Sequence, residues 1–267
     1  MAAAVITVLP ETGAAELNTV SVTASAADKV SGEWTYKKGF FAKGLTITGY
    51  TGKGKKVTVP AELDGMPVVT IGAKAFAGNT AVTELKIPEG ITSIESNSFQ
   101  GMTKLVAANI PGSVKKIENT LFAGDVALAK LTLAEGLTSI GTSAFSKCNA
   151  LAEVKFPSTL KTISDNAFVK SGVKKITIPA GVTSIGGQVF MDCTRLTSVT
   201  LPDGIKSIGN AAFGTCSNLT EITIPASCKS ISDNAFNACK NLKTIYGQSG
   251  SVAEEYANRK GIAFKKK

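Results

Sequence analysis

The cysteines are the side chains of this chain whose type and spacing could do chemistry. Four of the five lie three residues after a phenylalanine, at Cys148, Cys193, Cys216 and Cys239, and the last three are 23 residues apart. Stacking of equivalent segments would bring these side chains within about 5 Å of one another. Buried thiols, a disulfide and a zinc site all remain open. The pattern favours buried thiols, because parallel side chains do not face each other and no fourth zinc ligand is evident. Cys228 occupies an inward position and is expected in the core.

The absence of histidine removes most of the other chemistry. The 267 residues contain none, so the commonest general base and metal ligand at neutral pH is missing. Mechanisms of the Ser-His-Asp and Cys-His types are excluded. We find no catalytic, cofactor-binding or metal-binding candidates, and we expect a protein that is not an enzyme.

Two short motifs resemble known sites, and their context argues against both. The stretch "GYTGKGKK", residues 49–56, has the glycines and lysine of a phosphate loop. Lys56 replaces the hydroxyl residue that binds magnesium, and a strand-like run follows instead of a helix, so we interpret the stretch as a turn. The sortase signal "LPETG" at residues 9–13 is followed by more than 250 residues, and we interpret it as coincidence.

Residues 1–27 are composed mostly of small and apolar residues. They include an Ala-x-Ala sequence, Ala24 to Ala26, that is typical of a secretory cleavage site, but they lack a positive leading region. A clipped signal peptide and a disordered arm both remain open. No apolar run approaches the roughly 18 residues of a membrane helix, and we expect no membrane span.

The strongest feature of the sequence is an internal repeat. A phenylalanine recurs at intervals of 23 residues, with one interval of 22, and an isoleucine lies five residues before each copy. The marker residues are Phe76, Phe99, Phe122, Phe145, Phe168, Phe190, Phe213 and Phe236. A proline recurs with the same period, and Ala134 replaces it once. The single short interval, between Phe168 and Phe190, indicates either a tightened turn, which we favour, or a kink at a binding site.

Each repeat has the pattern of a strand that ends in a corner. Apolar and polar residues alternate before each proline, as in Ile176 and Ile178, which predicts a strand with one buried face. Proline has no N–H to donate and ends the strand. A single copy cannot bury a core, whereas stacked copies can. The sequence therefore predicts a β-rich α/β solenoid of about eight 23-residue coils.

The repeat resembles the BspA-like class of bacterial leucine-rich repeat proteins. Its length falls in the leucine-rich repeat window, and the I-G-x-x-A-F half of the motif carries the specific likeness, which covers residues 33 to 264. The resemblance implies a right-handed leucine-rich repeat superhelix. It also implies a non-catalytic cell-surface or secreted protein that binds proteins and adheres to host matrix or to other cells.

An open solenoid needs caps at both ends. We expect a signal or arm at 1–27, an N-terminal β cap at 28–64, repeats at 65–243 and a C-terminal cap at 244–267. Trp34, Tyr36 and Phe40 or Phe41 are the expected plugs over the first coil.

The C-terminal cap is expected to contain a short helix. Ser251 and Glu254 have capping-box spacing, and Gly261 ends the helix. Val252 and Tyr256 would face the last coil, and the residues after Gly261 would return to the sheet.

The outward strand positions form one continuous polar face in this interpretation. Two of them in each repeat, four and two residues before the proline, carry mainly Lys, Thr and Glu. The binding residues that we expect there are Lys130, Lys155, Lys175, Thr177, Thr200 and Tyr246. The expected partner of the monomeric chain is a protein ligand such as host extracellular matrix. Stacked aromatics beside a basic groove are missing, so we expect no nucleic-acid partner.

The distribution of charge supports a second hypothesis. Residues 28–60 hold seven lysines against Asp28 and Glu33, and the C-terminal segment 244–267 is also basic, while the middle is nearly balanced. Basic ends could hold an envelope structural module to anionic wall polymer. That module could also associate side by side with copies of itself.

Overall fold

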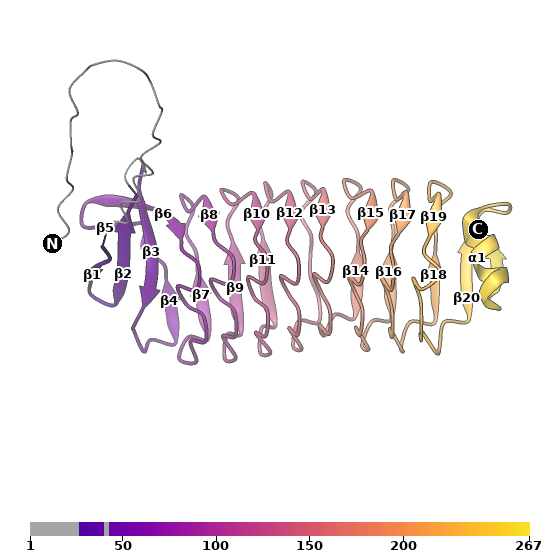
Figure 1. Cartoon of the computed structure of the whole chain (residues 1–267), viewed down its shortest axis with the longest axis horizontal. Coiled ribbons are helices and arrows are strands. Elements are labelled where there is room, and N and C mark those ends of the chain that lie inside the picture. Colours follow the sequence, from indigo (N-terminus) through magenta and orange to yellow (C-terminus); the bar gives the residue numbers. More distant parts are fainter. Residues whose placement is uncertain (1–26, 40–42) are drawn as a thin grey trace, which may run out of the picture.

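The computed structural model describes residues 27–39 and 43–267 of the chain. The described residues form an elongated solenoid with a cap at each end (Figure 1). The expectations for segment 1–26, for "LPETG" and for Phe40 and Phe41 lie outside the described residues. The helix α1 has nine residues and is too short to cross a membrane, and no other described helix could do so.

The strands before the prolines stack in parallel and form what we call the pre-proline sheet. Its strands are β4 (Lys56–Thr58), β7 (Glu84–Lys86), β9 (Ala107–Ile110), β11 (Lys130–Leu133), β14 (Lys175–Thr177), β16 (Ser198–Thr200), β18 (Glu221–Thr223) and β20 (Thr244–Gly247). Inward aliphatic residues alternate with outward polar ones along each strand, for example buried Ile176 between exposed Lys175 and Thr177. The predicted strands and their inward face are confirmed except at segment 152–156, which forms no strand.

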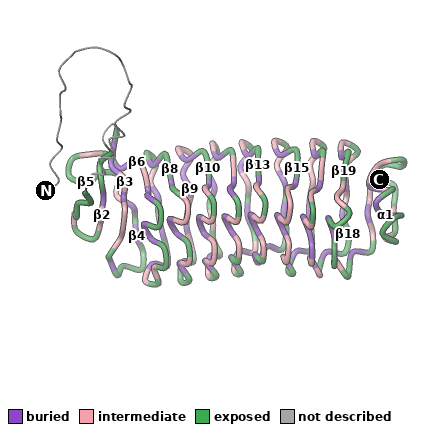
Figure 2. The backbone as a smooth tube through the Cα atoms, viewed as in Figure 1, coloured by how far each residue is buried: buried purple, intermediate pink, exposed green. Residues whose placement is uncertain are grey.

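A second parallel sheet lies on the opposite side of each coil, and we call it the return sheet. Its strands are β6 (Met66–Ile71), β8 (Ser93–Ile94), β10 (Lys116–Ile117), β12 (Ser139–Ile140), β13 (Thr162–Ile163), β15 (Ser184–Ile185), β17 (Ser207–Ile208) and β19 (Ser230–Ile231). The sequence pattern did not predict this sheet, because most of its strands have only two residues and are too short to show an alternation of apolar and polar residues. The recurring isoleucine is buried in nearly every copy and helps to close the core between the sheets. Figure 2 shows that buried segments recur from coil to coil.

The marker phenylalanines form a single buried stack along the solenoid. Neighbouring ring centroids lie 5.1–5.7 Å apart from Phe76 to Phe236. The backbone at this corner also bonds coil to coil: the Phe122 N–H donates to the Ala144 carbonyl at 2.8 Å. Residues with positive φ lie on both sides of seven of the eight rings, such as Asn97 at 65° and Gly101 at 74° around Phe99, and Phe236 has one on its C-terminal side only. These left-handed residues turn the N–H groups toward the next coil.

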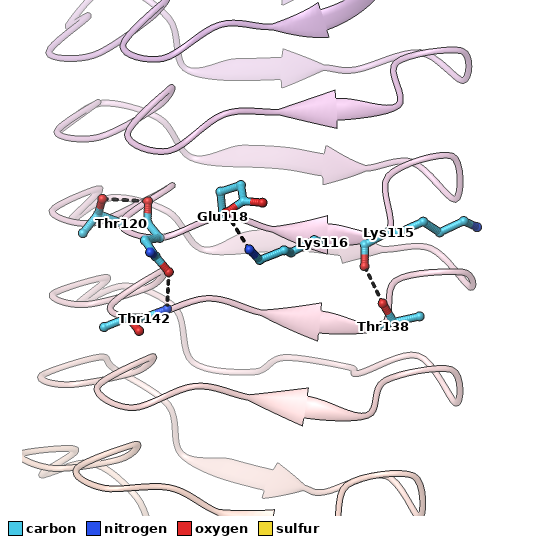
Figure 3. A network of polar contacts seen from close by, with 7 residues as sticks. Lys115, Lys116, Glu118, Thr120, Thr138 and Thr142 are labelled. Carbon is cyan, nitrogen blue, oxygen red and sulfur yellow. Dashed lines mark hydrogen bonds and ion pairs between the residues drawn. The ribbon is translucent and has the colours of Figure 1, made fainter. Parts of the chain in front are cut away.

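Side chains also join neighbouring coils (Figure 3). The Thr138 hydroxyl donates to the Lys115 carbonyl at 2.9 Å, and the Thr142 N–H donates to the Asn119 side-chain oxygen at 2.9 Å. Elsewhere the Glu89 carboxylate accepts the Gly112 and Ser113 N–H groups at 3.0 and 3.1 Å. These bonds, led by that of Gly112, hold the pKa of Glu89 below its usual value.

The N-terminal cap is built from β1 (Lys29–Ser31), β2 (Trp34–Lys38), β3 (Leu45–Tyr50) and β5 (Glu62–Leu63). The Trp34 ring lies 5.9 Å from the Phe76 ring, and the Tyr50 ring lies 5.4 Å from it, so both cover the start of the stack. Tyr50 was not among the expected plugs. Tyr36 is buried, and its hydroxyl donates to Asp64. The stretch 49–56, interpreted as a turn in place of a phosphate loop, contains the end of β3, a connection at 51–55 and the first residue of β4.

The C-terminal cap consists of α1 (Val252–Lys260) and β21 (Ala263–Lys266), which pairs with β20. Tyr256 packs edge-on against Phe236 at 5.7 Å, and Gly261 ends the helix with a φ of 67°, as predicted. The predicted capping box is wrong, because Ser251 and Glu254 do not make the hydrogen bonds expected of it. The Ser251 hydroxyl has no hydrogen bond within the described residues, and the Glu254 carboxylate accepts the Gly250 N–H at 2.7 Å instead.

Candidate binding face

The outward residues of the pre-proline sheet stack in two rows in the expected register. Pairing aligns Lys130 with Ala107, and an isolated bridge aligns Glu153 with Lys175. Thr177 lies beside Thr200 in the second row. The rows place Lys130, Glu153 and Lys175 in line, with Lys155 in the neighbouring row between Thr132 and Thr177.

Three hollows lie along this face and share lining residues. The first, of about 460 Å³, extends from β4 to Lys130 and Thr132. The second, of about 410 Å³, joins Lys130 to Glu153 and Lys155. The third and largest, of about 740 Å³, brings Lys155 together with Lys175 and Thr177. The structure therefore gathers four of the six expected binding residues along one chain of hollows.

The other two expected residues lie further along the sheet. Thr200 lines a separate hollow of about 640 Å³ that also contains Lys266 and Lys267. Tyr246, on β20, is half-buried, and the Lys265 ammonium lies 6.0 Å from its ring centroid. This end of the face forms a second, distinct region.

The expectation of a continuous face is wrong at one place. Segment 152–156, which should form a pre-proline strand, keeps only the isolated Glu153–Lys175 bridge and pairs with no described residue of β11. In the return sheet, β13 stays paired with β12 of the preceding coil but is not paired with β15 of the next coil. We call this discontinuity the break, and Figure 1 shows a wider spacing of the coils there.

Elsewhere in the described coils, at least one of the two sheets is continuous. The return sheet is interrupted between β8 and β10, where β7 and β9 remain paired. The pre-proline sheet is interrupted between β16 and β18, where β17 and β19 remain paired. At the break, between the coil of β13 and the coil of β14 and β15, the return strands are unpaired and the pre-proline side keeps only the isolated Glu153–Lys175 bridge, so it is the most open junction between described coils.

The break coincides with the single 22-residue interval. The coil loses one residue between Ser171 and Val173, and the turn tightens as expected, with the Gly172 N–H donating to the Cys148 carbonyl at 3.0 Å. A side chain at Gly172 would overlap the Asn149 carbonyl. Arg195 reaches back to that same carbonyl at 3.3 Å, across two coils. The shortened turn therefore draws one side of the coil toward its neighbour.

Two residues of the largest hollow were missed by the sequence analysis. Phe156 occupies the inward position that Ile178 fills in the next coil, but it is half-buried and packs edge-on against Phe168 at 5.8 Å. Lys174 is exposed and adds a third lysine to this hollow. The signals available were an aromatic at an aliphatic position and the adjacent short interval.

Comparison with known proteins is informative about the fold. The family pattern described as BspA type leucine rich repeat region matches residues 69–194 and 161–257, with six copies. This chain belongs to the BspA-type leucine-rich repeat family. No curated protein sequence matches the chain.

Solved structures of other bacterial proteins are similar to this BspA-type chain. The leucine-rich repeat protein TpLRR of T. pallidum is 29% identical, and the alignment covers 72% of this chain and 91% of that chain with a TM-score of 0.67. A leucine-rich repeat protein from Bacteroides ovatus is 22% identical, with coverage of 90% and 100% and a TM-score of 0.45. The pneumococcal vaccine antigen PcpA is 17% identical, with coverage of 83% and 82% and a TM-score of 0.45. The likeness to TpLRR agrees with the solenoid fold.

The cysteine positions of this BspA-type repeat are structural. All five cysteines are free thiols, and only Cys239 is not fully buried. The Cys148 and Cys193 thiols each donate to the carbonyl of an earlier marker phenylalanine at 3.1 Å. Burial raises the pKa of Cys193 to about 11, so its thiol is neutral at physiological pH. Among the described residues, no cluster of three His, Cys, Asp or Glu side chains could hold a metal ion.

Asp125 occupies the cysteine position in the coil of Phe122. Its side chain is fully buried, and one carboxylate oxygen accepts the Met102 N–H at 2.9 Å. The other oxygen has no hydrogen-bond partner among the described residues. Burial raises the pKa of Asp125 to about 9, so the carboxyl is neutral at physiological pH.

Proposed function

We propose that this protein is a non-catalytic, bacterial cell-surface or secreted repeat protein that binds protein ligands through its pre-proline sheet. The ligand in this proposal is a host matrix protein or a protein on another cell. The observation that carries the proposal is the chain of hollows from β4 to β14, along which Lys130, Lys155 and Lys175 lie. Membership of the BspA-type family supports a role in protein interaction.

The lysines supply charge to this face, and the hollows supply shape. Exposed Lys155 and Lys175 make no ion pair within the described residues, so both remain free to meet carboxylates of a partner. Solvent-exposed charges contribute modestly to affinity and more strongly to association rate. Apolar contact within the hollows would have to supply the remaining affinity.

Binding of the full chain to immobilised fibronectin, laminin and fibrillar collagen tests the proposal. Saturable binding that persists at physiological salt, and that falls with Lys155→Glu, is the expected result. The matched control is Lys206→Glu, because Lys206 is also exposed but precedes β17 in the return sheet. Equal loss with both variants, or no saturable binding, would contradict the proposal.

The alternative is an envelope module that binds anionic wall polymer or associates with copies of itself. The observation that favours it is the separate hollow in which Lys266 and Lys267 lie beside Thr200. A purely ionic contact should weaken steeply with salt. Binding to purified wall teichoic acid that disappears at physiological salt and requires Lys266 would favour this alternative.

A further inference from the structure

We infer that the break is a docking site for an extended, acidic segment of a partner protein, which adds to segment 152–156 by backbone hydrogen bonds. The inference rests on the proposed function and specifies which partner chemistry the binding face takes. It depends on three features of the break: free backbone groups, a half-buried aromatic ring and an excess of lysines.

The backbone of segment 152–156 has lost most of its pairing. Toward the next coil it keeps the Glu153–Lys175 bridge and the hydrogen bond from the Lys174 N–H to the Ala152 carbonyl at 2.9 Å. The backbone groups of Lys155 and Phe156 make no hydrogen bond to β11 or β14, all of which are described. Unpaired donors and acceptors in an extended segment are the template onto which a further strand adds.

The side chains around the break define what that strand should carry. Phe156 and Pro179 are half-buried and provide an apolar surface in the hollow of about 740 Å³. Lys155, Lys174 and Lys175 surround this surface and outnumber the single carboxylate, Glu153. Successive residues of a strand point to opposite faces. A segment that alternates apolar and acidic residues therefore directs one set toward Phe156 and the other toward solvent, within reach of the flexible lysine side chains.

The coils on either side of the break remain joined at the phenylalanine corner. The Phe168 N–H donates to the Val189 carbonyl at 2.9 Å, and the Lys170 N–H donates to the Met191 carbonyl at 2.9 Å. The Phe168 and Phe190 rings stay stacked at 5.5 Å. The phenylalanine corner and the Glu153–Lys175 bridge therefore hold the two coils together, while the hollow beside Lys155 and Phe156 leaves room for a guest segment to dock without breaking the core.

The test uses a fluorescein-labelled short peptide of alternating glutamate and valine with the full chain, followed by fluorescence anisotropy. A matched peptide has the same sequence with alternate backbone amides N-methylated on one edge, and a second has the methyl groups on the other edge. We expect one of the methylated peptides to bind about tenfold more weakly, because only the edge that faces Lys155 and Phe156 donates to the protein. Lys155→Glu should weaken binding of the unmodified peptide, whereas Lys206→Glu should not.

Hydrogen–deuterium exchange locates the peptide independently of any substitution. The amides of 153–156 should exchange rapidly in the free protein and become protected when the unmodified peptide is bound. Equal affinity for all three peptides, or protection outside the break, would overturn the inference. If the full chain binds a matrix protein through Lys155 while the peptide does not bind, the inference fails and the proposed function stands. If the peptide binds as expected while no matrix protein does, the docking site stands and the adhesive function fails.

Discussion

Replacement of the buried acid at Asp125 should make the protein more stable at neutral pH. In the unfolded chain this carboxyl ionises with its ordinary pKa of 3.8, whereas burial raises the pKa to about 9 in the folded protein. Between these values the folded state binds one more proton than the unfolded state. Stability from this group is therefore fully present below about pH 4 and is lost as the pH rises toward about 9.

The magnitude follows from the difference between the two pKa values. Within this window, the buried Asp125 lowers the free energy of unfolding by about 1.4 kcal/mol for each pH unit. The loss reaches about 4 kcal/mol at pH 7. Asp125→Asn keeps an acceptor for the Met102 N–H but places a neutral amide where the second oxygen has no partner. A buried, unpaired polar group costs about 1–3 kcal/mol. We expect a net stabilisation of about 1–3 kcal/mol at pH 7, and a net destabilisation near pH 4, where the unpaired amide still costs about 1–3 kcal/mol and the ionisation gain has almost vanished.

The assay is urea denaturation of both proteins from pH 5 to pH 8 in reducing buffer, followed by circular dichroism. The stability difference between Asp125→Asn and the parent should grow by about 1.4 kcal/mol per pH unit, because other titrating groups cancel in the difference. The neighbouring Cys148 thiol stays neutral throughout, since burial raises its pKa further. Asp203→Asn, at an exposed carboxylate, is the matched control. A difference that does not change with pH would refute the assignment of a neutral, buried Asp125.

Three further predictions concern packing and thiol exposure. Phe213→Ala removes a ring from the middle of the stack and should lower the free energy of unfolding by about 3–5 kcal/mol in urea denaturation. Thr200→Ala on the outward face should lower it little. Equal losses would contradict the inward and outward assignment. Gly172→Ala should destabilise the protein by more than about 2 kcal/mol, because the methyl group would overlap a carbonyl of the preceding coil. Gly204→Ala is the control, because a methyl group there would make only ordinary contacts. Native protein treated with a maleimide should be labelled first at Cys239, the one cysteine that is not fully buried; mass spectrometry that finds earlier labelling elsewhere would disprove the burial order.

The candidate site was only partly predictable from the sequence. The period of the repeat placed Lys130, Lys155 and Lys175 on one outward face, because side-chain direction alternates along a strand. The presence of Lys174 and Phe156 at the same hollow was missed. The solvent exposure of an inward side chain depends on how far its coil lies from the next coil. The local sequence pattern does not encode that spacing.

The capping of α1 shows the same limit on a smaller scale. Ser251 and Glu254 have the spacing of a capping box, yet the Glu254 carboxylate bonds the Gly250 N–H and the Ser251 hydroxyl makes no described bond. Spacing brings such groups within reach, and the side-chain rotamers decide which donor is met.

The sequence by itself determined the solenoid, because stacked coils can share a core only if apolar residues recur with the same period. The eight marker phenylalanines, the alternating strands and the two caps follow from that requirement. Only the tertiary structure decided where the stack opens. At the lost residue, Phe168 and Phe190 remain stacked at their corner, whereas the return strands β13 and β15 are unpaired and the pre-proline strands keep only one bridge. Backbone pairing between coils depends on distances of a few tenths of an ångström, which residue order alone does not specify.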